Sequence, residues 1–242
     1  MTRPSLQLVI PCYNEAGRLK PEVFLQLADG DVGLVLVNDG SRDGTAAILA
    51  GMAARGGDKV MVLTLADNAG KAGAVRAGVL AALERQPAFV GFWDADLAAP
   101  LTAVPEFMEV FRTRPDVDIV MGARVKLLGR DVKRSLLRHY CGRVFATAAS
   151  FVLGIGVYDT QCGAKIFRAT DRVQQAFGQP FQSKWIFDLE ILSRYLAAAG
   201  TDQADARIYE LPLMKWTAVP GSKLTVRHAL RAILDLALLA RR

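Results

Sequence analysis

Short apolar runs and amphipathic segments share the first half of the chain, and polar residues follow each run. In chain order, these runs and the two clearest helical patterns cover residues 6–10, 34–37, 45–54, 60–65, 72–83 and 89–93. Apolar runs of this length are typical of strands that are buried on both faces of a sheet. Strands separated by helices indicate parallel pairing through crossover connections. The pattern predicts an α/β fold with a mostly parallel central sheet and flanking helices.

The second half of the chain is less regular. Residues 118–122 resemble another buried strand, and residues 144–158 are apolar or small but include two glycines. The latter segment is short for a membrane span, and we interpret it as a buried or interfacial helix. Residues 226–242 predict a C-terminal amphipathic helix that follows a domain at 1–225. Docking on that domain and lying in a membrane interface both remain open for this helix.

The composition limits the class of protein. The 242 residues are 52% hydrophobic and 22% charged, which favours one compact domain over disorder. The three cysteines, Cys12, Cys141 and Cys162, are far apart and have neither zinc-site nor disulfide spacing, as expected in a reducing compartment. The chain begins without a signal-peptide pattern. We therefore expect a cytoplasmic protein that contacts the inner face of a membrane peripherally.

Positive charge is concentrated in one segment. Residues 124–143 hold seven arginines and lysines against a single acid, and this excess equals the net charge of +6 of the whole chain. Such a segment suits phosphate groups or anionic lipid. A solvated basic face is the alternative. Nucleic acid is not expected as a partner, because aromatic residues do not alternate with the basic ones.

Polar residues gather where the predicted strands end, and their chemistry suits a phosphorylated ligand. Tyr13, Asn14, Glu15, Asp39, Lys71, Asp94 and Asp96 all follow predicted strands. In open α/β sheets, ligands bind beyond the carboxyl ends of strands. Asp94 and Asp96 can share Mg²⁺ or Mn²⁺ with substrate phosphates if the chain turns there, whereas an ordinary turn is the structural alternative. Lys71, at a glycine-flanked helix start, suits phosphate.

The order of these motifs resembles glycosyltransferase family 2, which has the GT-A fold. The motifs are Val-Ile-Pro-Cys-Tyr-Asn-Glu, Val-Asn-Asp-Gly-Ser, Asn-Ala-Gly-Lys and Asp-Ala-Asp. Within the family, the chain is most similar to the dolichyl-phosphate glucosyltransferases, a polyprenyl-phosphate branch. This narrower resemblance depends on Thr-Gln-Cys-Gly at 160–163, Trp-Ile-Phe-Asp at 185–188 and Gly-Ser-Lys-Leu at 221–224. It implies a Rossmann-like sheet with acceptor-side helices near the C-terminus.

The resemblance also implies roles for individual residues. It assigns the nucleotide-sugar donor to Pro11, Tyr13, Asn14, Glu15, Asp39, Lys71 and Asp94. It makes Asp96 the main metal ligand, with Asp94 beside it. It places the acceptor phosphate near Arg124, Arg134, Arg138 and Lys223. It gives Asp188 an acid–base or sugar-binding role, so that Asp188, Asp96 and Lys71 are the expected catalytic residues.

The expected reaction is metal-dependent transfer of a hexose to a polyprenyl phosphate with inversion at the sugar. Ala98 occupies a position where mannose-transferring relatives often have Gln, which favours UDP-glucose over GDP-mannose as the donor. Three alternatives remain open. They are a GDP-mannose-dependent transferase, a family member with a hydroxyl acceptor in polysaccharide synthesis, and an inactive nucleotide-sugar binder or membrane-surface adaptor.

Overall fold

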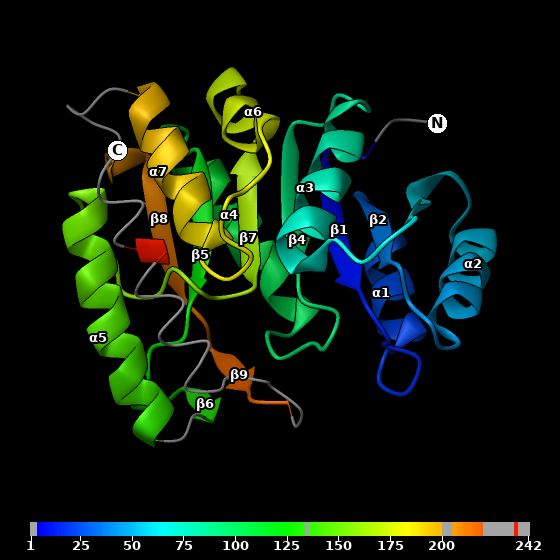
Figure 1. Ribbon diagram of the computed structural model, residues 1–242, viewed down its shortest axis with the longest axis horizontal. Helices are drawn as coiled ribbons and strands as arrows, with labels where there is room; N and C mark the ends of the chain where they lie inside the picture. Colours follow the sequence, from blue (N-terminus) through cyan, green and yellow to red (C-terminus); the bar gives the residue numbers. More distant parts are fainter. Residues whose placement is uncertain (1–3, 134–135, 200–204, 220–234, 237–242) are drawn as a thin grey trace.

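The sheet at the centre of the molecule is built from the five predicted strands and two further ones (Figure 1). The computed structural model describes residues 4–133, 136–199, 205–219 and 235–236. In spatial order, the seven strands are β3 (Val60–Leu65), β2 (Val32–Asp39), β1 (Leu6–Cys12), β4 (Phe89–Trp93), β7 (Ala164–Arg168), β5 (Ile119–Ala123) and β8 (Ile208–Pro212). All neighbouring pairs are parallel except those of β7, which runs antiparallel to β4 and β5. The expected mostly parallel sheet is confirmed.

Helices cover both faces of this sheet. One face packs against α1 (Pro21–Ala28), α2 (Thr45–Gly56) and α4 (Val104–Thr113). The other packs against α3 (Gly70–Leu83), α6 (Asp171–Gly178) and α7 (Phe187–Ala199). Alternate residues of β1 divide between the two cores, with Leu8 in the first and Val9 in the second. This two-sided burial explains why the strands read as continuous apolar runs.

Helix α5 (Leu136–Leu153) lies at the edge of the molecule and begins earlier than the sequence predicts. The prediction of a helix over residues 144–158 is wrong at both ends. Gly154 ends the helix with a φ of +69°, a conformation that suits glycine, and the basic residues before 144 form the first turns. Within the part of the chain that the model describes, no helix combines the length and apolarity of a membrane span.

A small second sheet lies below the main one in Figure 1. Strands β6 (Asp131–Lys133) and β9 (Lys215–Thr217) pair in parallel, and Thr217 N donates a 3.0 Å hydrogen bond to Ala98 O. This bond joins the second sheet to the loop that follows β4. The predicted C-terminal helix at 226–242 lies outside the described residues, apart from positions 235–236, so the division at 225 stays a prediction.

Candidate active site

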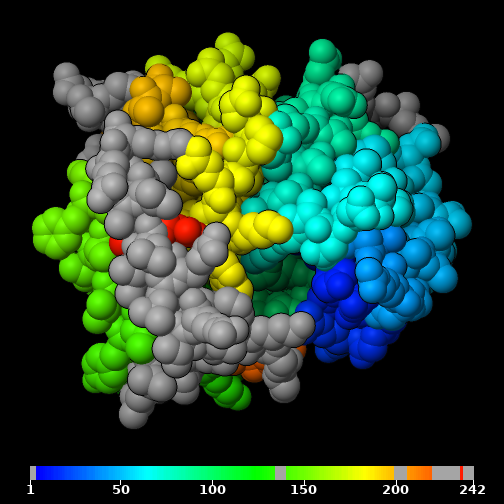
Figure 2. Space-filling view, viewed as in Figure 1, coloured from blue at the N-terminus to red at the C-terminus, as the bar shows by residue number. Residues whose placement is uncertain are grey.

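A cleft of about 360 Å³ opens beyond the carboxyl ends of β1, β2 and β4. In Figure 2 it is a hollow between the blue and cyan atoms of the first half of the chain and the yellow segment that precedes α7. Its lining includes seven of the predicted site residues, namely Pro11, Tyr13, Glu15, Asp39, Lys71, Asp94 and Asp96. The predicted convergence of polar residues at one edge of the sheet is therefore present in the structure.

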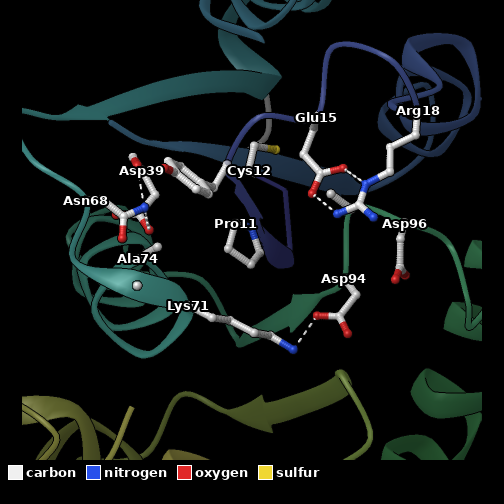
Figure 3. A pocket seen from close by; sticks show the side chains of 13 residues that line it. Pro11, Cys12, Glu15, Arg18, Asp39, Asn68, Lys71, Ala74, Asp94 and Asp96 are labelled. Carbon is white, nitrogen blue, oxygen red and sulfur yellow. Dashed lines mark hydrogen bonds and ion pairs between the residues drawn. The ribbon is translucent and has the colours of Figure 1, made fainter. Parts of the chain in front are cut away.

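The loop after β1 forms one wall of the cleft. Glu15 is buried, and its carboxylate makes a two-pronged ion pair with the guanidinium of Arg18 (Figure 3). Asn14 does not line the cleft. Its backbone is left-handed, with a φ of 53°, and its side-chain oxygen accepts a 2.9 Å hydrogen bond from Arg42 N. Asn14 thus holds the loop after β2 in place beside the cleft.

Asp39 organises the opposite wall. Its carboxylate accepts hydrogen bonds from Ala69 N at 2.7 Å and from Asn68 Nδ2 at 3.1 Å. Burial raises the pKa of Asp39, whereas the N–H groups of Ala69 and Gly70 and the positive charge of Lys184 oppose this rise. Asp39 therefore holds the start of α3, where the positive end of the helix dipole favours an anion.

Lys71 and Asp94 point toward one another across the cleft, as Figure 3 shows. Nζ of Lys71 lies 2.5 Å from Oδ1 of Asp94. Burial works to lower the pKa of Lys71, but the negative charges of Asp94, Asp188 and Asp96 raise it above its ordinary value. Lys71 is therefore a fixed positive charge at the start of α3, the place where a helix terminus also attracts phosphate.

Asp96 lies beside this pair on the loop that follows β4. Burial and the neighbouring charge of Asp94 both raise the pKa of Asp96, and Ala98 N donates a 3.0 Å hydrogen bond to its Oδ1. Two carboxylates that repel each other in this way are an arrangement that a divalent cation stabilises. No group of three or more His, Cys, Asp or Glu side chains suited to a metal occurs among the described residues. The two aspartates nevertheless fit Mg²⁺ or Mn²⁺, because donor phosphates and water supply its remaining oxygen ligands in sites of this kind.

The glycine of the Thr-Gln-Cys-Gly motif, Gly163, packs directly against Asp94. Its carbonyl oxygen accepts a 3.0 Å hydrogen bond from Asp94 N, so the two backbones run in contact. A Cβ atom at Gly163 would lie 1.9 Å from Oδ2 of Asp94. Only glycine leaves room for the Asp94 carboxylate in its present position.

Arg124 is held by a buried acid rather than left open to solvent. Its guanidinium makes two hydrogen bonds to Asp159, of 2.6 and 2.7 Å, and lies 5.4 Å from the centroid of the Trp216 ring. Glu210 in turn accepts hydrogen bonds from the backbone N–H groups of Tyr158 and Asp159. These contacts fix Arg124. Burial works to lower the pKa of Arg124, but the charge and hydrogen bonds of Asp159, and to a smaller degree the charge of Asp94, raise it above its ordinary value.

Asp188, at the start of α7, is not among the residues that line the cleft. It accepts a 2.5 Å hydrogen bond from Nζ of Lys165, which also donates to Cys162 O. Lys165 is fully buried, and Asp188 is 4% exposed. The negative charge of Asp188 nevertheless contributes to raising the pKa of Lys71, which lines the cleft.

The remaining predicted residues lie outside the described part of the site. Arg134 and Lys223 are not among the described residues, and the side chain of Arg138 is not described. Sequence reasoning missed Arg18 and assigned no site role to Asp159 or Lys165, although both belong to the segment that carries the Thr-Gln-Cys-Gly motif. Of these, Lys165 had a usable signal, because a lysine inside an otherwise apolar strand needs a buried partner.

Comparisons with known proteins agree with this fold and show the family. The model of glycosyl transferase family 2 matches residues 7–172, so the chain belongs to that family and is a glycosyltransferase with the GT-A fold. A dolichyl-phosphate beta-glucosyltransferase of Drosophila melanogaster is 33% identical to it, over 92% of this chain and 70% of the relative. The Dictyostelium discoideum dolichyl-phosphate beta-glucosyltransferase is 30% identical, over 90% of this chain and 68% of the relative.

Solved structures show the same fold at lower identity. Glucosyl-3-phosphoglycerate synthase from Mycobacterium tuberculosis, in complex with Mn²⁺, UDP and glucosyl-3-phosphoglycerate, aligns with a TM-score of 0.71 and 18% identity, covering 98% of this chain and 80% of its own. The mannosyltransferase PcManGT from Pyrobaculum calidifontis, in complex with GDP-Man and Mn²⁺, aligns with a TM-score of 0.65 and 18% identity, covering 100% and 65%.

Proposed function

We propose that this protein transfers glucose from UDP-glucose to a polyprenyl phosphate, with inversion at the sugar and with Mg²⁺ or Mn²⁺ as cofactor. The observation that carries the proposal is the Lys71–Asp94 pair with Asp96 beside it, in a chain that is 33% identical to a dolichyl-phosphate beta-glucosyltransferase. In this proposal the nucleoside lies along Pro11, Tyr13 and Asp39, and its diphosphate faces the first turn of α3.

The chemistry of the leaving group matches the charges in the cleft. Cleavage of the sugar–phosphate bond transfers an electron pair to the nucleoside diphosphate, which gains negative charge. A divalent ion held by Asp96 and Asp94 would neutralise part of that charge. Lys71 supplies a further positive charge that is already in place before the bond breaks, together with the positive end of the α3 dipole.

The acceptor needs orientation more than activation. A phosphate monoester has a second pKa near ~6, so it is mostly dianionic at neutral pH and is itself a nucleophile. In this proposal Arg124, fixed by Asp159 and Trp216, orients the acceptor phosphate and reduces its repulsion from the donor phosphates. Asp188 then shapes the sugar pocket through Lys165 and Lys71, without accepting a proton from the acceptor.

Product analysis with paired substrates tests this function. Purified protein is incubated with Mn²⁺ and either UDP-glucose or GDP-mannose, with a short-chain polyprenyl phosphate or the corresponding polyprenol as acceptor. Formation of a glucosyl phospholipid only from UDP-glucose and the phosphate supports the proposal. Transfer to the alcohol alone would indicate a hydroxyl acceptor, and transfer from GDP-mannose a different sugar. UDP binding without any product would indicate an inactive binder.

We also propose that the protein works as a peripheral protein at the cytoplasmic face of a membrane, where a polyprenyl phosphate acceptor is held. The exposed basic and apolar residues of the segment around β6 support this.

A further inference from the structure

Three apolar side chains project into solvent from one small region of the surface. Leu127 is 49% exposed, Leu128 is fully exposed, and Met214 is 52% exposed. Leu127 and Leu128 belong to the turn before β6, and Met214 belongs to the turn before β9. We call these three residues the apolar tip. Single exposed leucines are ordinary, but an exposed leucine pair in one turn is less so, and a backbone hydrogen bond from Asp131 N to Met214 O joins this turn to the one that carries the exposed methionine.

The backbone under the apolar tip is fixed. Arg130 N donates a 3.2 Å hydrogen bond to Leu127 O, which closes the first turn, and Asp131 N donates a 2.9 Å hydrogen bond to Met214 O, which joins the two turns. The Arg130 guanidinium donates to Pro212 O, and the buried side chain of Val132 anchors β6. The tip is therefore a formed structure whose exposure does not depend on a change of fold.

Three exposed lysines lie on the same two turns and short strands as the apolar tip. Lys126 precedes Leu127, and Lys215 follows Met214. Lys133 lies on β6, two residues after Asp131, the register partner of Lys215. We call these three residues the basic collar. The one acid between them, Asp131, lies 3.7 Å from Lys133 and is the register partner of Lys215, so the three lysines keep an excess of positive charge. Exposed apolar side chains next to positive charge match the acyl region and the anionic headgroups of a bilayer.

The apolar tip is joined to the reaction centre by short connections. Thr217, at the end of β9, bonds to Ala98, whose own N–H bonds to the Asp96 carboxylate. Trp216 of the same strand stacks on Arg124. In Figure 1, β6 and β9 lie on the side of the main sheet toward which β1 runs, which is the side that carries the cleft. A membrane that touches the tip therefore lies on the same side of the protein as Arg124 and Asp96.

We propose that the apolar tip inserts into an anionic lipid bilayer, with the basic collar against the lipid headgroups. This contact orients the cleft toward an acceptor that is embedded in the membrane. The second half of this proposal rests on the proposed polyprenyl phosphate acceptor, whereas the bilayer contact does not. A protein partner would need a complementary acidic groove, and it is the alternative that the following test separates from lipid.

Sedimentation with vesicles of phosphatidylcholine and phosphatidylserine in equal parts, without donor or acceptor, tests the contact. We expect the wild type to sediment with the vesicles and the double variant Leu127→Ser/Leu128→Ser to bind roughly tenfold more weakly. Phe151→Ser is the matched control, because Phe151 is 84% exposed on α5 but is not part of the tip. It should bind within about twofold of the wild type. Equal binding by the double variant, or an equal loss in Phe151→Ser, would overturn the proposal.

Fluorescence locates the inserted residue directly. In Leu128→Trp, brominated acyl chains should quench emission beyond the level seen for the three native tryptophans, and Phe151→Trp should show no such excess. Absence of excess quenching at position 128 would contradict insertion. Transfer to a short-chain acceptor in detergent is the separate measure of function, because it does not require a bilayer. Docking can therefore fail while transfer persists, and transfer can fail while docking persists.

Discussion

Nζ of Lys165 on β7 and the carboxylate of Asp188 on α7 form an ion pair of 2.5 Å in which both side chains are buried. The pair ties an antiparallel strand of the sheet to the helix behind the cleft. Because a buried charge that loses its partner is strongly destabilising, either residue is expected to be essential for the fold before any role in catalysis is considered.

Single and double substitutions of this pair should therefore not be additive. We expect Asp188→Asn and Lys165→Met each to lower the free energy of unfolding by about 3–5 kcal/mol. The double variant should lose clearly less than the sum, because it leaves no unpaired charge. Denaturant unfolding of the four proteins measures this, and additive losses would show that the two charges do not depend on each other.

The same variants separate positioning from proton transfer at Asp188. If Asp188 acts by positioning, folded Asp188→Asn should keep the pH profile of kcat while the KM for the sugar donor rises. If it accepts the acceptor's proton, the variant should lose kcat at every pH and lose the acidic limb of the profile. The proposed phosphate acceptor predicts the first result.

Gly163 should tolerate no side chain. In Gly163→Ala the new Cβ would occupy the place of the Asp94 carboxylate, which must then move away from Lys71. A displacement of this size near reacting groups typically reduces the rate by about 100-fold. Steady-state transfer assays on folded protein measure the effect.

Gly156→Ala is the matched control for that substitution. Gly156 precedes the same segment, and nothing lies within 4 Å of the position that its Cβ would take. Its activity should stay within about twofold of the wild type, because no contact is disturbed. Similar activities for the two alanine variants would contradict the packing of Gly163 against Asp94.

The three thiols should differ in reactivity. Burial and then the charge of Glu15 raise the pKa of Cys12 to about 12, and burial and then the charge of Asp159 raise that of Cys162 to about 11. Because the thiolate is the reactive form, a raised pKa leaves only about one Cys162 in 1,000 ionised at pH 8, and fewer for Cys12. Cys141 is exposed.

Mass spectrometry after brief treatment of the native protein with iodoacetamide at pH 8 checks this order. One alkyl group, on Cys141, is expected, and all three cysteines should react after unfolding in denaturant. Reactivity should increase as the pH rises toward 11, since the thiolate population of Cys162 then grows. Fast native labelling of Cys12 or Cys162 at pH 8 would disagree with their burial.

The strands in the first half of the chain can be predicted from the sequence because each of them is a recognisable apolar run. β1, β2, β3 and β4 are apolar runs that each end in polar residues, and the convergence of those residues follows from parallel pairing alone. β7 and β8 carry no such signal. Lys165 and Glu210 interrupt them, and the partners that make these charges acceptable come from distant segments.

The site shows the same division between local and distant information. Asp39, Lys71, Asp94 and Asp96 were predictable from their place after strands, and the structure gathers them in one cleft. The pairing of Arg124 with Asp159 was not predictable, because 35 positions separate the two residues and no periodic pattern relates them. The assigned roles of all these residues stay predictions until variants are measured.

The central claim is that Asp96 and Asp94 hold a divalent ion against the donor diphosphate. Crystals grown with UDP and Mn²⁺ test it through the anomalous signal of manganese. We predict one strong peak between the Asp96 carboxylate and the diphosphate, with Lys71 on the phosphate side, and no peak in Asp96→Asn. Bound UDP with no manganese beside Asp96, or an unchanged peak in the variant, would contradict the claim.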